Sequence, residues 1–248
     1  MDSYTRFRVE AVLRAVRDPA RTVRLLQSGV GWQRLRYLLR PVAARQISPT
    51  DDGLGVRRYP TYDDYVAHQR SKLDLLDLSE YDVVFRQALA GRLANTGDWA
   101  GRTVLCLAAR IGSEVRAFHD VGAFAVGIDL NPGAGSEYVL HGDFHHLVFP
   151  DASADVVYTN SLDHALDLKR LVHEVTRVLR PGGTFLVDAQ SGSGVSEFDE
   201  WAATVWQDTD DLIRLIEQHG LRLICRQPIA APWHGDHLTF RSARVAER

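Results

Sequence analysis

The feature that most constrains the fold is an alternation, from Thr103 onward, between short apolar runs and helical stretches. The runs include TVLCLAA, AFAVGIDL, ADVVYTNS and GTFLVDA. Strands that are buried on both faces and separated by helices are typical of a parallel sheet covered by helices on both sides. The last two runs, LRLICRQ and HLTFRSARV, follow each other closely and predict an antiparallel hairpin at one end of the sheet. We therefore expect a doubly wound α/β domain.

The segment before this alternation differs in charge. Residues 1–47 hold ten arginines against three acidic residues, whereas the remaining 201 residues hold 19 basic and 29 acidic ones. Apolar residues at three- and four-residue steps predict a basic helical arm, and the Pro-, Gly- and Asp-rich residues 48–60 predict a linker. We expect an N-terminal helical arm and linker over 1–60 and one domain over 61–248. The arm docks on the acidic body, forms a homodimer contact, or binds an anionic membrane or polyanion.

Composition and charge exclude several classes of protein. A chain that is 45% hydrophobic and 25% charged is neither disordered nor fibrous. No apolar stretch approaches the roughly 18 residues of a membrane span, and the charged start is unlike a signal peptide. Cys106 and Cys225 lack metal-ligand spacing and predict a reducing, cytoplasmic location. Because the body is acidic, we expect no nucleic-acid partner.

Two strand ends carry candidate ligand-binding residues. Ligands of an open parallel sheet bind beyond the carboxyl ends of its strands. The first strand runs into the small residues of 107–112 and opens a helix at Ser113, where backbone N–H groups are available to a ligand. The second strand ends at Asp129, which is placed to accept hydrogen bonds from a ribose diol. These features suit dinucleotides and adenosyl ligands alike.

Two further segments favour the adenosyl ligand. HGDFHHLVFPDASADVVYTNSLDH carries Gly-Asp before an LPF-like turn, and EVTRVLRPGG ends in an Arg-x-Leu-x-Pro-Gly-Gly turn. Together with residues 104–112 and Asp129, these motifs resemble the class I S-adenosylmethionine-dependent methyltransferases over about residues 61–245. The resemblance implies a seven-stranded Rossmann-like sheet, S-adenosylmethionine as cofactor and methyl transfer. The chain also looks similar to the mycobacterial enzymes that methylate mannose polysaccharides, which implies a sugar or saccharide acceptor.

The resemblance also implies cofactor contacts. Asp129 would hold the ribose hydroxyls, and Asp143 with the Phe144 N–H would bind the amine edge of adenine. The expected cofactor site comprises Ala108, Ala109, Arg110, Gly112, Asp129, Leu130, Asp143, Phe144, Asn160 and Ser161.

The first turn departs from the family pattern of an acid followed by Gly-x-Gly-x-Gly. Cys106 replaces the acid, and Ala108 and Arg110 replace two glycines. Arg110 either clashes with the methionine carboxylate or binds it as a bidentate partner. The alternative function that this departure raises is a non-catalytic adenosyl-binding or partner subunit.

The ends of the fourth and fifth strands supply candidate catalytic residues. One interpretation makes His164 the base for a hydroxyl acceptor, with Asp188 as its orienting carboxylate. A second places Asp163 and Asp188 around a divalent cation such as Mg²⁺. A third makes His164 and Asp188 ordinary helix caps. The first two predict O-methylation of a small hydroxylated acceptor.

Polar residues elsewhere are candidates for a lid over the acceptor. A helix with Thr61 as its N-cap carries four hydrogen-bonding side chains on one face, either solvated or closing a polar pocket. The candidate lid and rim residues are Tyr65, His68, Gln69, Lys72 and His145.

Other segments have more general expectations. His146 points away from His145 because neighbouring side chains of an extended segment alternate. A helix over 81–95 has Val83, Val84, Phe85, Leu89 and Leu93 as its core stripe, and another helix is expected around 198–219. Trp201 and Trp206 line the acceptor site or pack in the core. His234, Asp236 and His237 are expected to be solvated turn residues.

Overall fold

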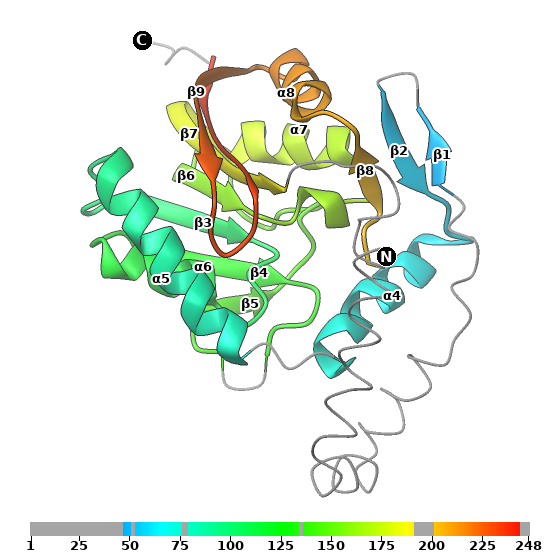
Figure 1. Ribbon diagram of the computed structural model, residues 1–248, viewed down its shortest axis with the longest axis horizontal. Coiled ribbons are helices and arrows are strands. Elements are labelled where there is room, and N and C mark those ends of the chain that lie inside the picture. Colours follow the sequence, from blue (N-terminus) through cyan, green and yellow to red (C-terminus); the bar gives the residue numbers. More distant parts are fainter. Residues whose placement is uncertain (1–46, 51–52, 76–78, 134–135, 191–200, 244–248) are drawn as a thin grey trace, which may run out of the picture.

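The central element of the fold is a seven-stranded sheet. The computed structural model describes residues 47–50, 53–75, 79–133, 136–190 and 201–243. The strand order is β5-β4-β3-β6-β7-β10-β9 (Figure 1). The strands are β3 (Thr103–Leu107), β4 (Phe124–Asp129), β5 (Val139–His141), β6 (Ala154–Thr159), β7 (Leu179–Gln190), β9 (Leu221–Ile229) and β10 (Gly235–Ser242). Strands β3 to β7 pair in parallel, and β10 is antiparallel to both β7 and β9. The expected doubly wound sheet with a terminal hairpin is confirmed.

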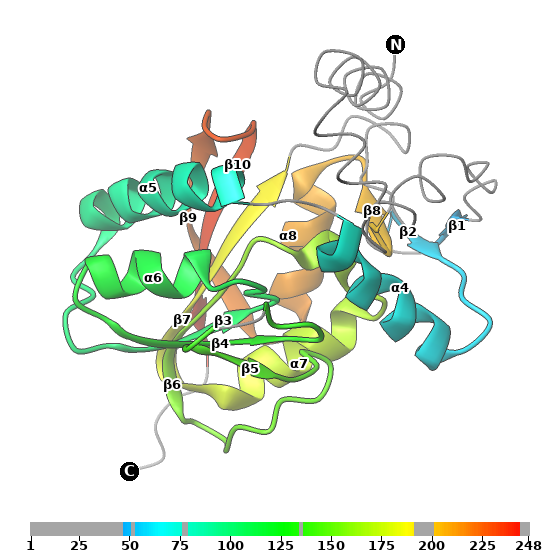
Figure 2. The same cartoon turned by 90° about the horizontal axis from the view of Figure 1, so that it is seen from below.

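Helices cover both faces of this sheet (Figure 2). Helices α5 (Ser79–Thr96) and α6 (Ser113–Asp120) lie on one face, and α7 (Leu168–Val178) and α8 (Thr209–Gln218) lie on the other. Successive side chains of a strand point to opposite faces. Strand β3 therefore packs Val104 and Cys106 into the core under α5 and α6, and Leu105 and Leu107 into the core on the opposite face. Burial on both faces explains why these runs are continuously apolar.

Two helix expectations need correction. In α5, Phe85, Leu89 and Leu93 are fully buried, but Val83 and Val84 are about half exposed, at 54% and 51%. Positions separated by four residues share one face of a helix, and Val83 and Val84 lie on another. The helix expected around 198–219 begins only at Thr209. Before it, Thr204–Trp206 forms strand β8.

The segment expected to be a linker contains two strands. Strands β1 (Ile47–Pro49), β2 (Leu54–Arg57) and β8 form a second, three-stranded antiparallel sheet. This small sheet and helix α4 (Tyr62–Leu75) lie beyond the carboxyl ends of the central strands (Figures 1 and 2). The helical arm and its dimer contact lie outside the described residues, and the domain boundary at residue 60 remains a prediction. None of the described helices is long and apolar enough to cross a membrane.

The sheet reverses its strand order at β3. This strand lies between β4 on one side and β6 on the other. Ligands of doubly wound sheets bind in the crevice outside the carboxyl ends at such a switch point. A ligand is therefore expected at the loops that follow β3, β4 and β6.

Candidate active site

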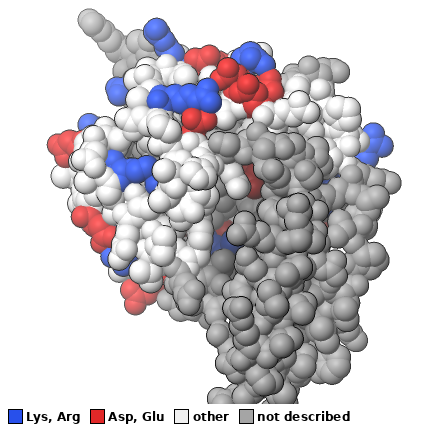
Figure 3. Space-filling view, viewed as in Figure 1, with Lys and Arg blue, Asp and Glu red and all other residues white. Residues whose placement is uncertain are grey.

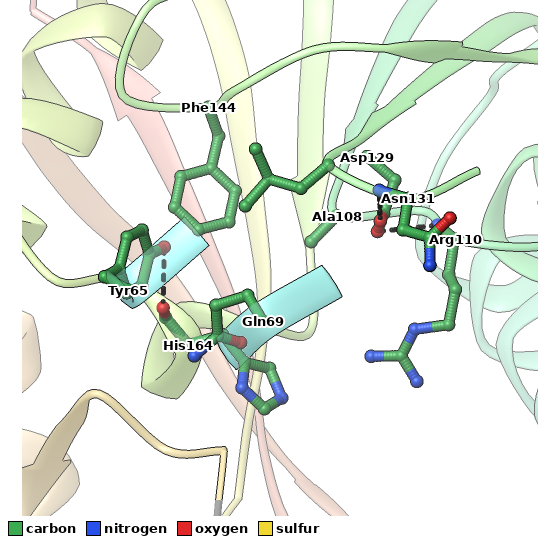
Figure 4. A pocket seen from close by; sticks show the side chains of 9 residues that line it. Tyr65, Gln69, Ala108, Arg110, Asp129, Asn131, Phe144 and His164 are labelled. Carbon is green, nitrogen blue, oxygen red and sulfur yellow. Dashed lines mark hydrogen bonds between the residues drawn. The ribbon is translucent and has the colours of Figure 1, made fainter. Parts of the chain in front are cut away.

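Two adjoining cavities open at this switch point. The first, here named the Asp129 cavity, is shown in Figure 4 and is lined by Tyr65, Gln69, Ala108, Arg110, Asp129, Leu130, Asn131, Phe144 and His164. The second, here named the Glu114 cavity, is lined by Lys72, Tyr81, Ala108, Ala109, Arg110, Ile111, Ser113, Glu114, Asn160, Ser161, Leu162, Asp163, His164, Asp188, Gln190, Trp206 and Trp233. Three residues, Ala108, Arg110 and His164, line both cavities, so the two cavities adjoin.

The turn after β3 is fixed by Asp129. One carboxylate oxygen accepts the Arg110 N–H at 3.0 Å, and the other accepts the Asn131 N–H at 2.8 Å. Ala108 and Arg110 have φ angles of 55° and 43°. This is the left-handed region that favours glycine, so the chain keeps the backbone path of a Gly-rich turn at both replaced positions. Ala108 and Arg110 therefore leave the shape of the turn intact.

Most of the expected cofactor residues line one of the two cavities. The eight that do are Ala108, Ala109, Arg110, Asp129, Leu130, Phe144, Asn160 and Ser161. Gly112 lines neither; it sits at the N-cap of α6 with φ 84°. A side chain there would be strained and would approach Arg116 and Val139 at 3.3 Å. Gly112 serves the turn into the helix.

Asp143 also lies outside both cavities, and its expected contact with adenine stays a prediction. Its carboxylate accepts the Tyr62 hydroxyl at 2.5 Å and lies 3.0 Å from His145 Nδ1. Burial raises the pKa of the Asp143 carboxyl, but hydrogen bonds from His145 and Tyr62 outweigh it, and the pKa falls to about 2. The structure thus uses Asp143 to hold α4 on the loop after β5.

His145 belongs to this same contact and does not reach the rim of either cavity. Its ring is fully buried between Tyr62 and Phe144, with centroid separations of 5.9 Å and 4.7 Å. It lines a separate cavity beside α7, together with Asp167 and Arg170. His146 is exposed, but residues 143–146 form a turn in which the His146 N–H donates to the Asp143 carbonyl at 3.0 Å, so the expectation of an extended segment is wrong.

The polar face of α4 lies against the two cavities. Tyr65 and Lys72 are buried, with Tyr65 0% and Lys72 8% exposed. The Tyr65 hydroxyl donates to the His164 carbonyl at 3.0 Å, and the Gln69 amide donates to the Trp201 carbonyl at 2.7 Å. His68 lines neither cavity; its ring stacks on the Trp201 ring, with the two centroids 6.2 Å apart. Three of the four side chains on this face, Tyr65, Gln69 and Lys72, line the cavities, and the role of the face as a lid stays a prediction.

The start of α4 follows the sequence prediction. The Thr61 hydroxyl accepts the Asp64 N–H, and the Asp64 carboxylate accepts the Thr61 N–H, both at 3.1 Å. Such a reciprocal cap satisfies two backbone donors that the helix leaves open. It fixes the point from which α4 crosses the site.

His164 has partners other than the expected Asp188. Its Nδ1 lies 3.2 Å from the Trp201 carbonyl, and its Nε2 lies 3.0 Å from Lys72 Nζ. Because a carbonyl only accepts, Nδ1 carries the proton and Nε2 accepts from the lysine. Asp163 is the nearer carboxylate, with Oδ2 at 3.8 Å from Nε2. The prediction that Asp188 orients His164 is wrong.

Asp188 is buried in a network of its own. Its carboxylate accepts the Tyr158 hydroxyl at 2.7 Å, pairs with His237 Nδ1 at 2.5 Å, and forms an ion pair with Arg92 of α5. His237 stands opposite Asp188 in the β7–β10 register and is 1% exposed, so the expectation that it is a solvated turn residue is wrong. Donors therefore occupy both carboxylate oxygens.

This arrangement does not fit the expected cation site. A divalent cation needs several oxygen ligands, and Asp188 already accepts from cationic and hydroxyl donors. Within the described part of the chain, no group of three or more His, Cys, Asp or Glu side chains could hold a metal ion. We derive no step through a metal at Asp163 and Asp188.

Several lining residues of the Glu114 cavity were not anticipated from the sequence, among them Glu114, Tyr81 and Trp233. Glu114 stands in the first turn of α6 and is 6% exposed. Tyr81 and Trp233 come from α5 and from the loop between β9 and β10, and the Trp233 indole N–H lies 3.2 Å from the Tyr81 hydroxyl. A signal existed only for Glu114, as an acid just after a ligand-binding turn. Nothing in the sequence places the two aromatic residues at this site.

Comparisons with known proteins point to one family. Residues 105–187 match the model of a family described as a methyltransferase domain. The chain is similar to a probable S-adenosylmethionine-dependent methyltransferase of Mycolicibacterium smegmatis, 34% identical over 43% of this chain and 42% of that protein. It is also similar to a sterol 24-C-methyltransferase of Gibberella zeae, 32% identical over 52% of this chain and 34% of that protein. The chain spans less than half the length of these curated relatives.

Solved structures agree on the fold. A 1,6-didemethyltoxoflavin N1-methyltransferase of Burkholderia thailandensis, with its acceptor and S-adenosylhomocysteine bound, has a TM-score of 0.61 and 19% identity, covering 82% of this chain and 97% of that one. A Haloferax volcanii complex of the methyltransferase activator Trm112 has a TM-score of 0.55 and 20% identity, covering 75% of this chain and 97% of that one. At these identities the likeness shows the fold alone.

Proposed function

We propose that the chain is a class I S-adenosylmethionine-dependent methyltransferase, which its similarity to that family supports, and that it transfers a methyl group to a hydroxyl of a small acceptor such as a sugar or saccharide. The observation that carries the proposal is the pair of adjoining cavities, with Asp129 at the end of one and His164 shared between them. In this proposal, adenosine occupies the Asp129 cavity, and the methionine end lies in the Glu114 cavity.

The side chains that line the Asp129 cavity, and not its volume of about 30 Å³, suit a nucleoside. Figure 4 shows the Phe144 ring and the Asp129 carboxylate on the same cavity wall, with Tyr65 and Gln69 of α4 facing them. A ribose diol can donate two hydrogen bonds to a carboxylate, and an aromatic face can pack on the base. A dinucleotide fits less well, since the turn after β3 lacks the glycines that let a pyrophosphate approach.

The far wall of the Glu114 cavity suits a small hydroxylated acceptor. Lys72, Asp163 and Gln190 supply hydrogen-bonding groups, while Trp206 and Trp233 supply ring faces that can pack on a sugar. The cavity encloses about 270 Å³, below the usual range for small-molecule sites, and the cofactor takes part of it. The lining groups, and not this size, favour a hydroxylated acceptor.

Methyl transfer to a hydroxyl must also remove a proton. Bound S-adenosylmethionine would supply the methyl group and leave as S-adenosylhomocysteine, and the acceptor hydroxyl would lose its proton to a base of the protein. We propose His164 for this role, because its Nδ1–H is held by the Trp201 carbonyl and its Nε2 carries the lone pair. The acceptor hydroxyl would take the place of Lys72 at Nε2.

Nucleic acid is not the acceptor in this proposal. Figure 3 shows acidic and basic side chains interspersed over the described part of the face in view, without a continuous basic patch there. Binding a polyanion requires clustered cations. Both cysteines are free thiols, which suits the cytoplasmic location that we also propose.

Calorimetry tests the proposed function. We expect S-adenosylmethionine and S-adenosylhomocysteine to bind with dissociation constants in the micromolar range, and NAD to give no heat. Binding without transfer to any sugar, when the acceptors are screened with methyl-labelled cofactor, would favour the alternative of an adenosyl-binding partner subunit. Absence of adenosyl binding would refute the methyltransferase proposal.

A further inference from the structure

Glu114 is the buried charged group that the proposed mechanism leaves unexplained. Its side chain lines the Glu114 cavity, and its Oε1 accepts a hydrogen bond from the Asn160 amide at 3.2 Å. Among the described residues, no cation forms an ion pair with it. A buried carboxylate without a counter-charge is costly. Its position therefore calls for a positively charged partner from outside the chain.

Arg110 lines the same cavity and carries the opposite charge. Its backbone N–H binds Asp129, but its guanidinium makes no hydrogen bond or ion pair with any described residue. Figure 4 shows the guanidinium extending away from Asp129. The two groups form no ion pair with each other, although the Arg110 charge lowers the pKa of Glu114. Such a pair is complementary to a ligand that carries both an ammonium and a carboxylate.

Cys106 leaves the end of β3 without an acidic side chain. Cys106 stands where the family pattern has an acid at the end of the first strand. It is fully buried in β3, and burial raises the pKa of its thiol well above the usual value, so it stays neutral. The chain therefore lacks the acid at its usual place.

We propose that Glu114 binds the α-ammonium of the cofactor's methionine moiety, with Arg110 on the α-carboxylate, and so replaces the acid that Cys106 has displaced. The inference rests on the proposed function, since it names further residues for the same cofactor. It places the amino-acid end of the ligand beside α6 and directs the sulfur toward Asp163 and His164.

The charges around Glu114 make this contact depend on pH. Burial raises the pKa of Glu114 to about 7; Arg110 and the Asn160 hydrogen bond oppose this, and Asp129 reinforces it. Tyr81, Cys106 and Tyr158 also face Glu114 and stay neutral, because burial raises the pKa of each. Only the ionised form attracts an ammonium. Cofactor affinity should therefore rise several-fold from pH 6 to pH 8 and flatten above.

The test compares ligands with and without the amino-acid end, in the wild type and in Glu114→Gln. The probes are S-adenosylhomocysteine, its decarboxylated analogue, which keeps the ammonium, and 5′-methylthioadenosine, which has neither charge. We expect E114Q to bind the first two about 10- to 100-fold more weakly and 5′-methylthioadenosine equally well. The pH dependence of binding should disappear in E114Q.

Controls separate this inference from the proposed function. Glu217→Gln makes the same chemical change on α8, where Glu217 accepts the Leu223 N–H, and should leave binding of all three probes unchanged. Glu114→Asp keeps the charge and should retain part of the lost affinity if E114Q folds poorly. Equal binding of S-adenosylhomocysteine by wild type and E114Q overturns the role of Glu114 and leaves the proposed function standing. No binding by the wild type overturns the proposed function.

Discussion

The two ends of the site are built in different ways. The proposed cofactor end is formed by strand-end turns, in which Asp129 accepts the N–H of Arg110, within the turn after β3, and the N–H of Asn131, two residues after β4 ends. The acceptor end is assembled from α4, α5, β8 and the β9–β10 loop, which are remote in sequence. The cofactor end is therefore encoded in local motifs, whereas the acceptor end depends on long-range packing. Changes at one end should leave the other largely intact.

The largest effect is expected from the network that holds the acceptor end. Asp188→Asn removes a fully buried carboxylate and leaves the partly buried Arg92 guanidinium without its counter-charge. We expect the free energy of unfolding to fall by about 3–5 kcal/mol, measured by urea denaturation. As a control, Asp236→Asn breaks the partly exposed pair with Arg226 and should cost below about 1 kcal/mol. Equal costs would show that the Asp188 network does not hold this end.

The next effect separates cofactor binding from stability. Asp129→Ala removes the expected ribose contact and the two backbone hydrogen bonds. We expect cofactor affinity to fall about 30- to 1000-fold, or roughly 2–4 kcal/mol, in a protein that still folds. Calorimetry gives the affinity and circular dichroism checks the fold. An unchanged dissociation constant in the folded variant would contradict the cofactor assignment.

A smaller effect is expected from the shared residue between the cavities. His164→Ala should lower turnover by more than about tenfold and leave the affinity for S-adenosylmethionine nearly unchanged, because the ring faces the acceptor. Lys72→Met is the matched variant, since it removes the group at His164 Nε2 and keeps the ring. Normal turnover of a hydroxyl acceptor by His164→Ala would make His164 a structural residue.

The smallest effect on stability is expected at the contact between α4 and Asp143. Tyr62→Phe removes the hydroxyl that donates to Asp143 and should cost about 1 kcal/mol of stability. Because Asp143 lines neither cavity, cofactor affinity should stay within about twofold. A marked loss of affinity in calorimetry would support the adenine contact of Asp143 that the family pattern implies.

The sequence predicts the cofactor end well because its signals are local. Short apolar runs placed the strands, and small residues after β3 with Asp129 after β4 placed the ligand turn. Phe144 and Asn160 also line the cavities as expected. Each of these residues is positioned by the strand that directly precedes it. Backbone connectivity alone therefore brings them to one edge of the sheet.

The sequence predicts the acceptor end poorly because its pairings are remote. Asp188 and His237 are neighbours only through the register of β7 and β10. Strand β8 pairs with β2, a segment whose composition suggested a linker. No periodicity shows such partners. Asp188 was thus placed correctly at a strand end, but its partner is His237 and not the predicted His164.

The most direct test of this two-ended site is a crystal structure with S-adenosylhomocysteine bound. We expect the ribose hydroxyls to bind Asp129 and the amino-acid end to lie between Glu114 and Arg110. The sulfur should face His164, with Trp206 and Trp233 beyond it. A ligand found with its adenine against Trp206 and Trp233, or no ligand in either cavity at saturating concentration, would contradict this arrangement.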